Sequence, residues 1–259
     1  MRPVLFNFFG LEIHSYGLML AIAFLVGIYG AGKSVRRFNV NFDIMIDLGI
    51  WALIGAVLGA RIAYVITEYP YFLDAPVEIF KINSGGLAFH GGLFGGFLAG
   101  YWFTKIKKLD TWKIADVIAP FLALGYTIVR IGCFFNGCCY GKVSSLPWAM
   151  QCSAHDSILR HPTQLYSMIG SFGLFIILTG MRNHKRFSGF LFLLYIGMYS
   201  VMRFIVEIFR EGPMIYPWLS LAQLVCVILG VFAFGLIWIL EARHQKRGLK
   251  VDAASEINS

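Results

Sequence analysis

The chain has 259 residues, of which 58% are hydrophobic and only 14% are charged. Soluble globular proteins average about 45–50% apolar and about 25% charged residues, so this composition excludes an ordinary soluble protein. The formal net charge of +8 is compatible with nucleic-acid binding, but the positions of Lys and Arg along the chain favour a different explanation.

Long apolar segments occupy most of the sequence. Because a membrane-spanning helix needs about 20 apolar residues, the length suffices for about seven spans joined by short loops. The expected spans are residues 13–31, 44–67, 86–104, 115–134, 163–181, 188–209 and 218–240. We therefore predict an all-α, polytopic membrane protein in which residues 1–240 form one transmembrane domain and residues 241–259 form a polar, frayed tail.

Basic residues gather in every second loop. They include 14 of the 22 Lys and Arg residues: Lys33, Arg36, Arg37, Lys105, Lys107, Lys108, Lys113, Arg182, Lys185, Arg186, Arg243, Lys246, Arg247 and Lys250. The other loops carry acidic residues, namely Glu68, Asp74, Glu78, Asp156 and Glu211. This is the positive-inside pattern, which predicts an N-terminus outside and a C-terminus in the cytoplasm. The basic charge therefore indicates membrane orientation and not nucleic-acid binding.

Glycines are dense in the second and third expected spans. Gly55 and Gly59 form a G-x-x-x-G pattern, and we interpret them, with Gly96 and Gly100, as sites of close helix packing. The Gly85-Gly86 pair lies just before the third span, where glycine permits a turn or a close approach of the backbone to a ligand.

Ionisable residues inside the expected spans are the first functional candidates, because a charge at the bilayer centre costs about 2.5–3.5 kcal/mol on insertion scales. Arg61 and Arg130 lie near outer span ends, where snorkelling to the headgroups is the alternative explanation. Arg203, Glu207 and Arg210 lie toward the end of the sixth expected span and share one helical face. An ion pair between Arg203 and Glu207 is therefore an alternative explanation for these two residues. Excess buried arginine over carboxylate nevertheless predicts an anionic ligand, and phospholipid headgroups are the commonest anions at that depth.

His90 lies between an apolar segment and Gly91-Gly92, at the outer end of the third span. A lone histidine is more often structural than catalytic, but flanking glycines leave the ring accessible to act as a proton acceptor. Tyr16 lies near the outer end of the first span, where it serves equally well as an interfacial anchor.

Five cysteines leave several interpretations open. Cys133, Cys138 and Cys139 form a C-x4-C-C group, with Cys152 downstream and Cys226 alone in the last span. The spacing is a poor match to a zinc site, so we expect no metal. A disulfide on the outer face, a thiol redox site and small packing residues are the remaining alternatives.

Six segments carry a family resemblance that covers nearly the whole chain. Arg130 to Gly141 resembles the signature G-R-x-G-N-F-x-N-x-E-x-x-G of prolipoprotein diacylglyceryl transferases. The other segments occur in the order of that family: SYGLM at 15–19, GARIAYV at 59–65, SGGLAFHGGLFGG at 84–96, HPTQLY at 161–166 and RFIVEIFR at 203–210.

The resemblance implies transfer of a diacylglyceryl group from phosphatidylglycerol to the lipobox cysteine thiol of preprolipoproteins, in the bilayer of the bacterial inner membrane and without a cofactor. It implies that His90 is a base or proton relay with Tyr16 beside it, and that Arg130 and Arg203 bind the phosphate. The further residues that it assigns to substrate binding or its support are Arg61, Gly91, Gly92, Asn136, Gly141, Glu207 and Arg210.

Two positions depart from the signature. Its first asparagine is Cys133 and its glutamate is Cys138 in this chain. Thiols are weak hydrogen-bonding groups, so altered headgroup contacts are one consequence. The alternatives are a family paralogue acting on a different lipid or acceptor, and a membrane thiol-redox protein. In the transferase interpretation the acceptor thiol belongs to the incoming protein, so the enzyme needs no cysteine nucleophile.

Overall fold

The computed structural model describes residues 4–8, 11–38, 40–81, 85–152, 157–183, 186–210, 214–216 and 219–257. Asp156, Lys185 and Glu211, which the charge pattern includes, lie outside these ranges, as does Ser84 of the third motif.

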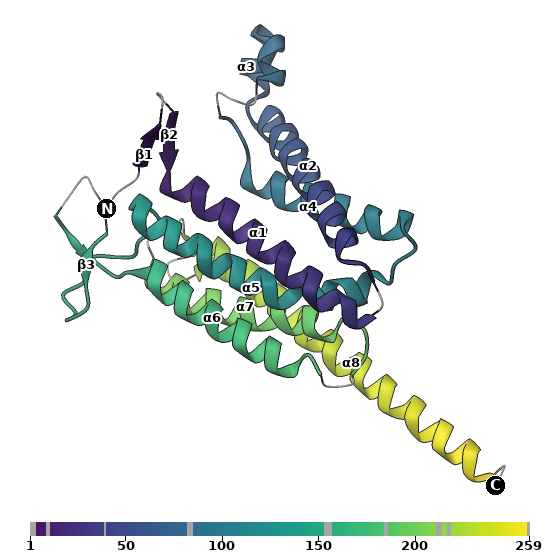
Figure 1. Cartoon of the computed structure of the whole chain (residues 1–259). Helices are drawn as coiled ribbons and strands as arrows, with labels where there is room; N and C mark the ends of the chain where they lie inside the picture. Colours follow the sequence, from purple (N-terminus) through teal and green to yellow (C-terminus); the bar gives the residue numbers. More distant parts are fainter. Residues whose placement is uncertain are drawn as a thin grey trace. The chain divides into compact units, whose positions relative to one another are not determined.

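Helices dominate the described chain (Figure 1). The helical elements are α1 (Ser15–Val35), η1 (Arg36–Phe38), α2 (Phe42–Thr67), α3 (Tyr69–Asp74), η2 (Pro76–Phe80), α4 (Phe89–Ile106), α5 (Thr111–Asn136), α6 (Thr163–Met181), α7 (Phe190–Ile208) and α8 (Leu221–Ile257). The strands form three antiparallel pairs: β1 (Val4–Phe8) with β2 (Leu11–His14), β3 (Met150–Gln151) with β4 (Leu159–Arg160), and β5 (Met214–Tyr216) with β6 (Leu219–Ser220).

Six helices of the described chain are long and apolar enough to cross a membrane. These candidate spans are Ser15–Phe38, Phe42–Thr67, Thr111–Asn136, Thr163–Met181, Phe190–Ile208 and Leu221–His244. Each coincides with one expected span. The remaining expected span, 86–104, corresponds to α4, an 18-residue helix. Its glycines, His90 and Lys105 make α4 less apolar than the other six.

The structure divides into two compact units, which are described separately. Unit 1 comprises Met1–Tyr29 and Ala115–Ser259, and unit 2 comprises Gly30–Ile114.

Unit 2 is built on a close crossing of α2 and α4. A Cβ atom added at Gly95 would overlap the Gly55 carbonyl oxygen and would lie 2.9 Å from Gly59 Cα. A Cβ at Gly59 would likewise overlap the carbonyl oxygen of Gly91. The two backbones therefore touch, as the G-x-x-x-G pattern predicted for Gly55 and Gly59.

We expect Gly95→Ala to lower the melting temperature of the detergent-solubilised protein. An added methyl group overlaps backbone that cannot move aside, and overpacking of this kind costs about 1–3 kcal/mol. Gly173→Ala is the matched control, since Gly173 lies inside α6, where an added Cβ would meet nothing within 4 Å among the described residues apart from the backbone of its own helix. That change should leave stability equal or slightly raised, because alanine favours helices over glycine. Equal melting temperatures for both variants would contradict the close crossing.

Unit 1 packs α5, α6 and α7 around one apolar core. Its buried members are Ala119, Ala123, Leu174, Leu178, Phe190 and Leu191. Asp116 of α5 accepts hydrogen bonds from the backbone N–H groups of Gly189 (2.7 Å) and Phe192 (2.9 Å). These donors lie at the start of α7, where N–H groups lack partners within the helix, so Asp116 fixes α7 against α5.

Helix α8 begins at a capping box and is longer than expected. The backbone N–H of Ser220 donates to Gln223 Oε1 (3.0 Å), and that of Gln223 donates to Ser220 Oγ (3.2 Å). This reciprocal pair satisfies two N–H groups at the helix start. The helix then continues to Ile257, as the long yellow helix in Figure 1 shows, so the expectation of a frayed tail from Glu241 was wrong. The helical hydrogen bonds continue past the end of the apolar segment.

Candidate functional site

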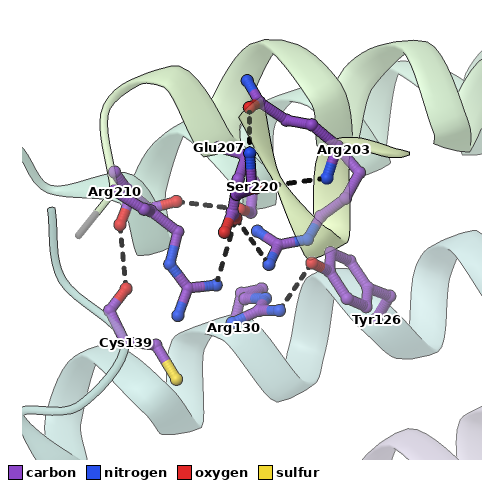
Figure 2. A network of polar contacts seen from close by, with 10 residues as sticks. Tyr126, Arg130, Cys139, Arg203, Glu207, Arg210 and Ser220 are labelled. Carbon is purple, nitrogen blue, oxygen red and sulfur yellow. Dashed lines mark hydrogen bonds and ion pairs between the residues drawn. The ribbon is translucent and has the colours of Figure 1, made fainter. Parts of the chain in front are cut away.

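An ion-pair group lies at the C-terminal end of α7 in unit 1 and includes Arg210, two residues beyond the helix. Arg203 Nη2 lies 2.7 Å from Glu207 Oε2, and Arg210 Nη1 lies 3.9 Å from the same oxygen. The pair expected from the spacing of Arg203 and Glu207 is thereby confirmed. Figure 2 shows Arg130, from α5, lying below this group with its guanidinium beside Tyr126. We call Arg130, Arg203, Arg210 and Glu207 the arginine cluster.

Positive charge exceeds negative charge in the arginine cluster, which has three guanidinium groups and one carboxylate, that of Glu207, paired with Arg203 and Arg210. The side chains of Arg203 and Glu207 are only 16% and 7% exposed. Three buried guanidinium nitrogens, Arg130 Nε, Arg203 Nη1 and Arg210 Nε, make no hydrogen bond within the described chain. A buried donor without a partner costs about 1–3 kcal/mol or more, so the cluster is suited to an anion that offers several oxygens.

Arg130 is held by an aromatic neighbour that the sequence analysis missed. Its Nη2 donates to the Tyr126 hydroxyl at 2.6 Å, and its guanidinium lies 4.5 Å from the centre of the Tyr126 ring. Tyr126 in turn packs edge-on against Tyr199 of α7, with ring centres 5.3 Å apart. The sequence signal was the four-residue separation of Tyr126 and Arg130, which places both on one face of a helix.

The C-terminus of α5 gathers three thiols beside Arg130. The Cys138 N–H donates to the Cys133 carbonyl (3.1 Å), and the Gly137 N–H donates to that of Phe134 (3.2 Å). Gly137 has φ +69°, so these bonds form a Schellman motif, which turns the chain back over the last helical turn. The Sγ atoms of Cys133, Cys138 and Cys139 consequently all lie within 4.8 Å of one another.

All five cysteines are free thiols in the structure. Hydrogen bonds from Cys133 and Cys138, together with the charges of Arg130 and Arg210, hold the pKa of the Cys139 thiol well below its usual value. Arg130 Nη1 also lies 3.9 Å from Cys133 Sγ, so the set of three cysteines is in direct contact with the arginine cluster.

The HPTQLY segment fixes the backbone around these thiols. Thr163 Oγ1 donates to the carbonyl of Cys139, and Gln164 Nε2 donates to that of Cys138, both at 2.8 Å. Gly141 closes the same region, since a Cβ there would overlap the Phe209 carbonyl oxygen and lie 2.8 Å from His161 Cβ. Gly141 therefore packs closely against neighbouring protein atoms, and the role in substrate binding that the resemblance implied stays a prediction.

Tyr16 lies at the start of α1, and Asn136 lies at the C-terminal end of α5. The Cα atom of Tyr16, at the start of α1, would lie 3.3 Å from a Cβ placed on Gly132 of α5. This contact brings Tyr16 next to the helical turn that carries Arg130 and Cys133. Asn136 is the last residue of α5 and is partly exposed.

An apolar groove of about 880 Å³ runs along α6 and α7 in unit 1. It is lined mainly by aliphatic and aromatic side chains, including Ile169, Leu174, Val201 and Ile205. Its polar lining residues are Trp148, His161 and Tyr166, whose hydroxyl accepts from Trp148 Nε1 at 2.8 Å. A groove with this lining suits a hydrocarbon chain.

Arg61 belongs to unit 2, and its guanidinium group donates hydrogen bonds to backbone carbonyls. Its Nε donates to Ile79 (2.9 Å), its Nη1 donates to Gly85 (3.0 Å) and Gly86 (2.9 Å), and its Nη2 donates to Glu78. The residue is only 7% exposed. Every guanidinium nitrogen is thus paired, so these contacts favour the supporting role for Arg61 over direct headgroup binding.

We expect Arg61→Lys to destabilise the protein by at least about 2 kcal/mol, because one ammonium group cannot replace four hydrogen bonds to a charged donor. The melting temperature should fall, whereas the KM for lipid of the protein that remains folded should stay within about twofold. Arg36→Lys, at an exposed arginine of the same unit, is the control and should alter neither quantity. A raised KM with unchanged melting temperature would restore Arg61 to the substrate site.

His90 also belongs to unit 2, where it is the second residue of α4 and is exposed. The neighbouring glycines contact α2 instead of open space: a Cβ at Gly91 would overlap the Gly59 carbonyl, and one at Gly92 would lie 3.3 Å from that of Ala56. These contacts show that both glycines pack against α2, and their expected contact with the substrate stays a prediction. The structure therefore groups Tyr16, Arg130, Arg203, Glu207 and Arg210 in unit 1, and Arg61 and His90 in unit 2.

Comparisons with known proteins agree with the motifs. The model of the prolipoprotein diacylglyceryl transferase family matches residues 3–239. The chain is 36% identical over 228 residues to a phosphatidylglycerol-prolipoprotein diacylglyceryl transferase of Clostridioides difficile, covering 88% of this chain and 91% of that protein. A protein of the same name from Clostridium tetani is 36% identical over 244 residues, covering 91% and 98% of the two chains. One from Finegoldia magna is 34% identical over 253 residues, covering 97% and 99%.

Proposed function

The chain belongs to the prolipoprotein diacylglyceryl transferase family, and we propose that it transfers the diacylglyceryl group of phosphatidylglycerol to the lipobox cysteine of preprolipoproteins. It is a multi-pass membrane protein and a transferase. The observation that supports the proposal from the structure is the arginine cluster, in which three guanidinium nitrogens have no hydrogen-bond partner among the described residues and suit the phosphate of the lipid donor.

The reaction is a displacement at carbon. The lipobox sulfur attacks the glyceryl carbon that bears the phosphate, the new C–S bond forms as the C–O bond breaks, and glycerol phosphate leaves. The thiol proton passes to a base, for which we propose the exposed ring of His90. Arg130 and Arg203 offset the charge that grows on the departing phosphate, with Arg210 and Glu207 supporting them.

Residues around the arginine cluster orient its side chains, and an apolar groove is available for the acyl chains. Tyr126 orients the Arg130 guanidinium, and Tyr16 lies at the turn of α5 that carries Arg130. We assign Asn136, which ends that helix, to the headgroup side of the site. The apolar groove along α6 and α7 suits an acyl chain of the lipid.

We propose that the protein crosses the bacterial inner membrane seven times. The seven spans are the six helices that are long and apolar enough to cross a membrane, together with α4. The N-terminus lies outside and the C-terminus in the cytoplasm, because the basic loops alternate with acidic ones. Residues 1–240 form the catalytic transmembrane domain, and 241–259 extend it into the cytoplasm.

We expect reporter fusions after Arg186 and Lys250 to read as cytoplasmic and a fusion near Ser157 to read as periplasmic. Alkaline phosphatase and green fluorescent protein, active on opposite sides of the membrane, give paired readings at each site. Readings in the reverse sense at all three sites would contradict seven spans with the N-terminus outside. A count of six spans, without α4, would place the Arg186 and Lys250 fusions on the same side as the N-terminus and the Ser157 fusion on the opposite side.

The direct test is incubation of the purified protein with phosphatidylglycerol and a lipobox peptide, followed by mass spectrometry of the peptide. We expect a mass gain equal to one diacylglyceryl group, located on the cysteine and absent when the cysteine is replaced by serine. Phosphatidylethanolamine is the control donor. Modification from that lipid but not from phosphatidylglycerol would identify a paralogue with another donor, and no modification from either would overturn the transferase proposal.

A further inference from the structure

The group of Cys133, Cys138 and Cys139 has a geometry that packing alone does not require. Their Sγ atoms lie within 4.8 Å of one another. Metal–sulfur bonds of about 2.3 Å place two thiolates about 3.8 Å apart in a tetrahedral site and about 4.0 Å apart in a trigonal one. Movements of about 1 Å or less would therefore bring all three sulfurs to one ion.

The backbone holds the three residues in this arrangement. The Schellman motif sets Cys138 over Cys133, and Cys139 has φ +64°, a conformation that non-glycine residues rarely adopt. This reversal lets two adjacent side chains turn toward the same partner. The carbonyls of Cys138 and Cys139 are fixed by Gln164 and Thr163, which are fully buried. The thiols are thus preorganised by residues outside the group.

A positive charge lies beside the sulfurs. Arg130 Nη1 lies 3.9 Å from Cys133 Sγ, so a guanidinium is positioned to stabilise a thiolate from the second coordination shell. Within the described chain the candidate ligand group contains only these three cysteines, with no His, Asp or Glu side chain among them. An all-sulfur donor set selects soft ions such as Cu(I) or Zn(II) over hard ones.

We propose that Cys133, Cys138 and Cys139 form a three-thiolate site for a soft d10 metal ion, with Cu(I) the best match. Zn(II) prefers four ligands, whereas Cu(I) accepts three sulfurs. Binding converts three thiols and one Cu(I) into a thiolate complex of charge −2 and releases three protons. The positive excess of the arginine cluster offsets that charge. Cys133 and Cys138, the two residues that depart from the family signature, are both ligands of this site, so one function accounts for both replacements.

The test uses the full chain in detergent, reduced with a phosphine and freed of metal. Anaerobic titration with Cu(I) against a competing chelator should show one equivalent bound, with sulfur-to-copper charge-transfer absorption. Zn(II) and Cd(II) are titrated separately, and tighter binding of Zn(II) than Cu(I) would overturn the choice of ion. Serine replacement at Cys133, Cys138 or Cys139 should each weaken binding at least tenfold. Cys226→Ser, which removes another buried thiol, is the matched control and should bind as the wild type does.

A second measurement needs no variant. Bound Cu(I) should protect Cys133, Cys138 and Cys139 from alkylation in the wild-type protein, as read by mass spectrometry of peptides, and leave Cys152 and Cys226 unchanged. Absence of charge-transfer absorption, equal loss of binding in Cys226→Ser, or alkylation that metal does not slow would each overturn the site. A preparation that gains metal only through other cysteines would also overturn it. Because no lipid or peptide acceptor is used, the outcome is independent of the transferase reaction.

Discussion

Replacement of Arg203 or Arg130 by lysine is expected to lower kcat/KM for phosphatidylglycerol by about 100-fold or more. Lysine keeps the positive charge but has no planar fork, so it cannot present two parallel donors to phosphate oxygens. Loss of one donor that stabilises a developing oxyanion costs about 10²–10³ in kcat. Both residues qualify, because Arg130 Nε and Arg203 Nη1 are buried without a partner in the described chain.

The effect should be separable from instability. Arg243→Lys, at an exposed position of α8, is the matched control and should turn over at the wild-type rate. Melting temperatures of all three variants should remain close, since a lysine at 203 can still pair with Glu207. If both Arg130→Lys and Arg203→Lys kept wild-type kcat/KM, the arginine cluster would be a structural ion-pair group and the phosphate site would have to lie elsewhere.

Local spacing predicted the parts of the site that depend on one helix. The separation of Arg203 and Glu207 by four residues predicted their ion pair, because residues at that spacing share a helical face. The same rule, applied to Tyr126 and Arg130, would have found the tyrosine that holds the guanidinium. Sequence periodicity is sufficient wherever both partners belong to the same helix.

Contacts with irregular backbone could not be predicted in this way. The position of Arg61 near the outer end of its span predicted an anionic ligand or snorkelling to the headgroups, but its partners are carbonyls of η2 and of the Gly85-Gly86 segment. Carbonyl groups occur at every residue, so nothing in their sequence marks them as acceptors. The structural role of Arg61 depends on the fold of the segment from η2 to Gly86, which brings these carbonyls to the Arg61 side chain on α2.

The thiol group shows a similar limit. The C-x4-C-C spacing is a poor match to known metal motifs, yet the three sulfurs meet. Their meeting depends on the left-handed backbone of Gly137 and Cys139. Glycine at a helix end signals the first of these turns. No sequence rule marks a cysteine for the second, so spacing alone underestimated the cluster.

Replacement of His90 by alanine is expected to lower kcat by about 10²–10⁴-fold, the usual contribution of a positioned general base. The ring is exposed at the start of α4 and packs edge-on against Phe89, with centres 5.6 Å apart. Removal of an exposed ring should cost little stability, so the melting temperature should change by less than about 2 °C. His244→Ala, at an exposed histidine of α8, is the control for a general effect of losing an imidazole.

Rescue by added imidazole distinguishes the chemical role of His90 from a structural one. If the ring takes the lipobox thiol proton, free imidazole or a small amine should restore part of the rate of His90→Ala, because an external base then forms the thiolate. The recovery should grow with the basicity of the amine and should be absent in Arg203→Lys, whose defect is in binding the departing phosphate. A loss below about tenfold, or a large loss that no base restores, would leave His90 as a packing residue. The proton would then have to pass to another group, of which Tyr16 is the first to test, because it lies beside the turn of α5 that carries Arg130.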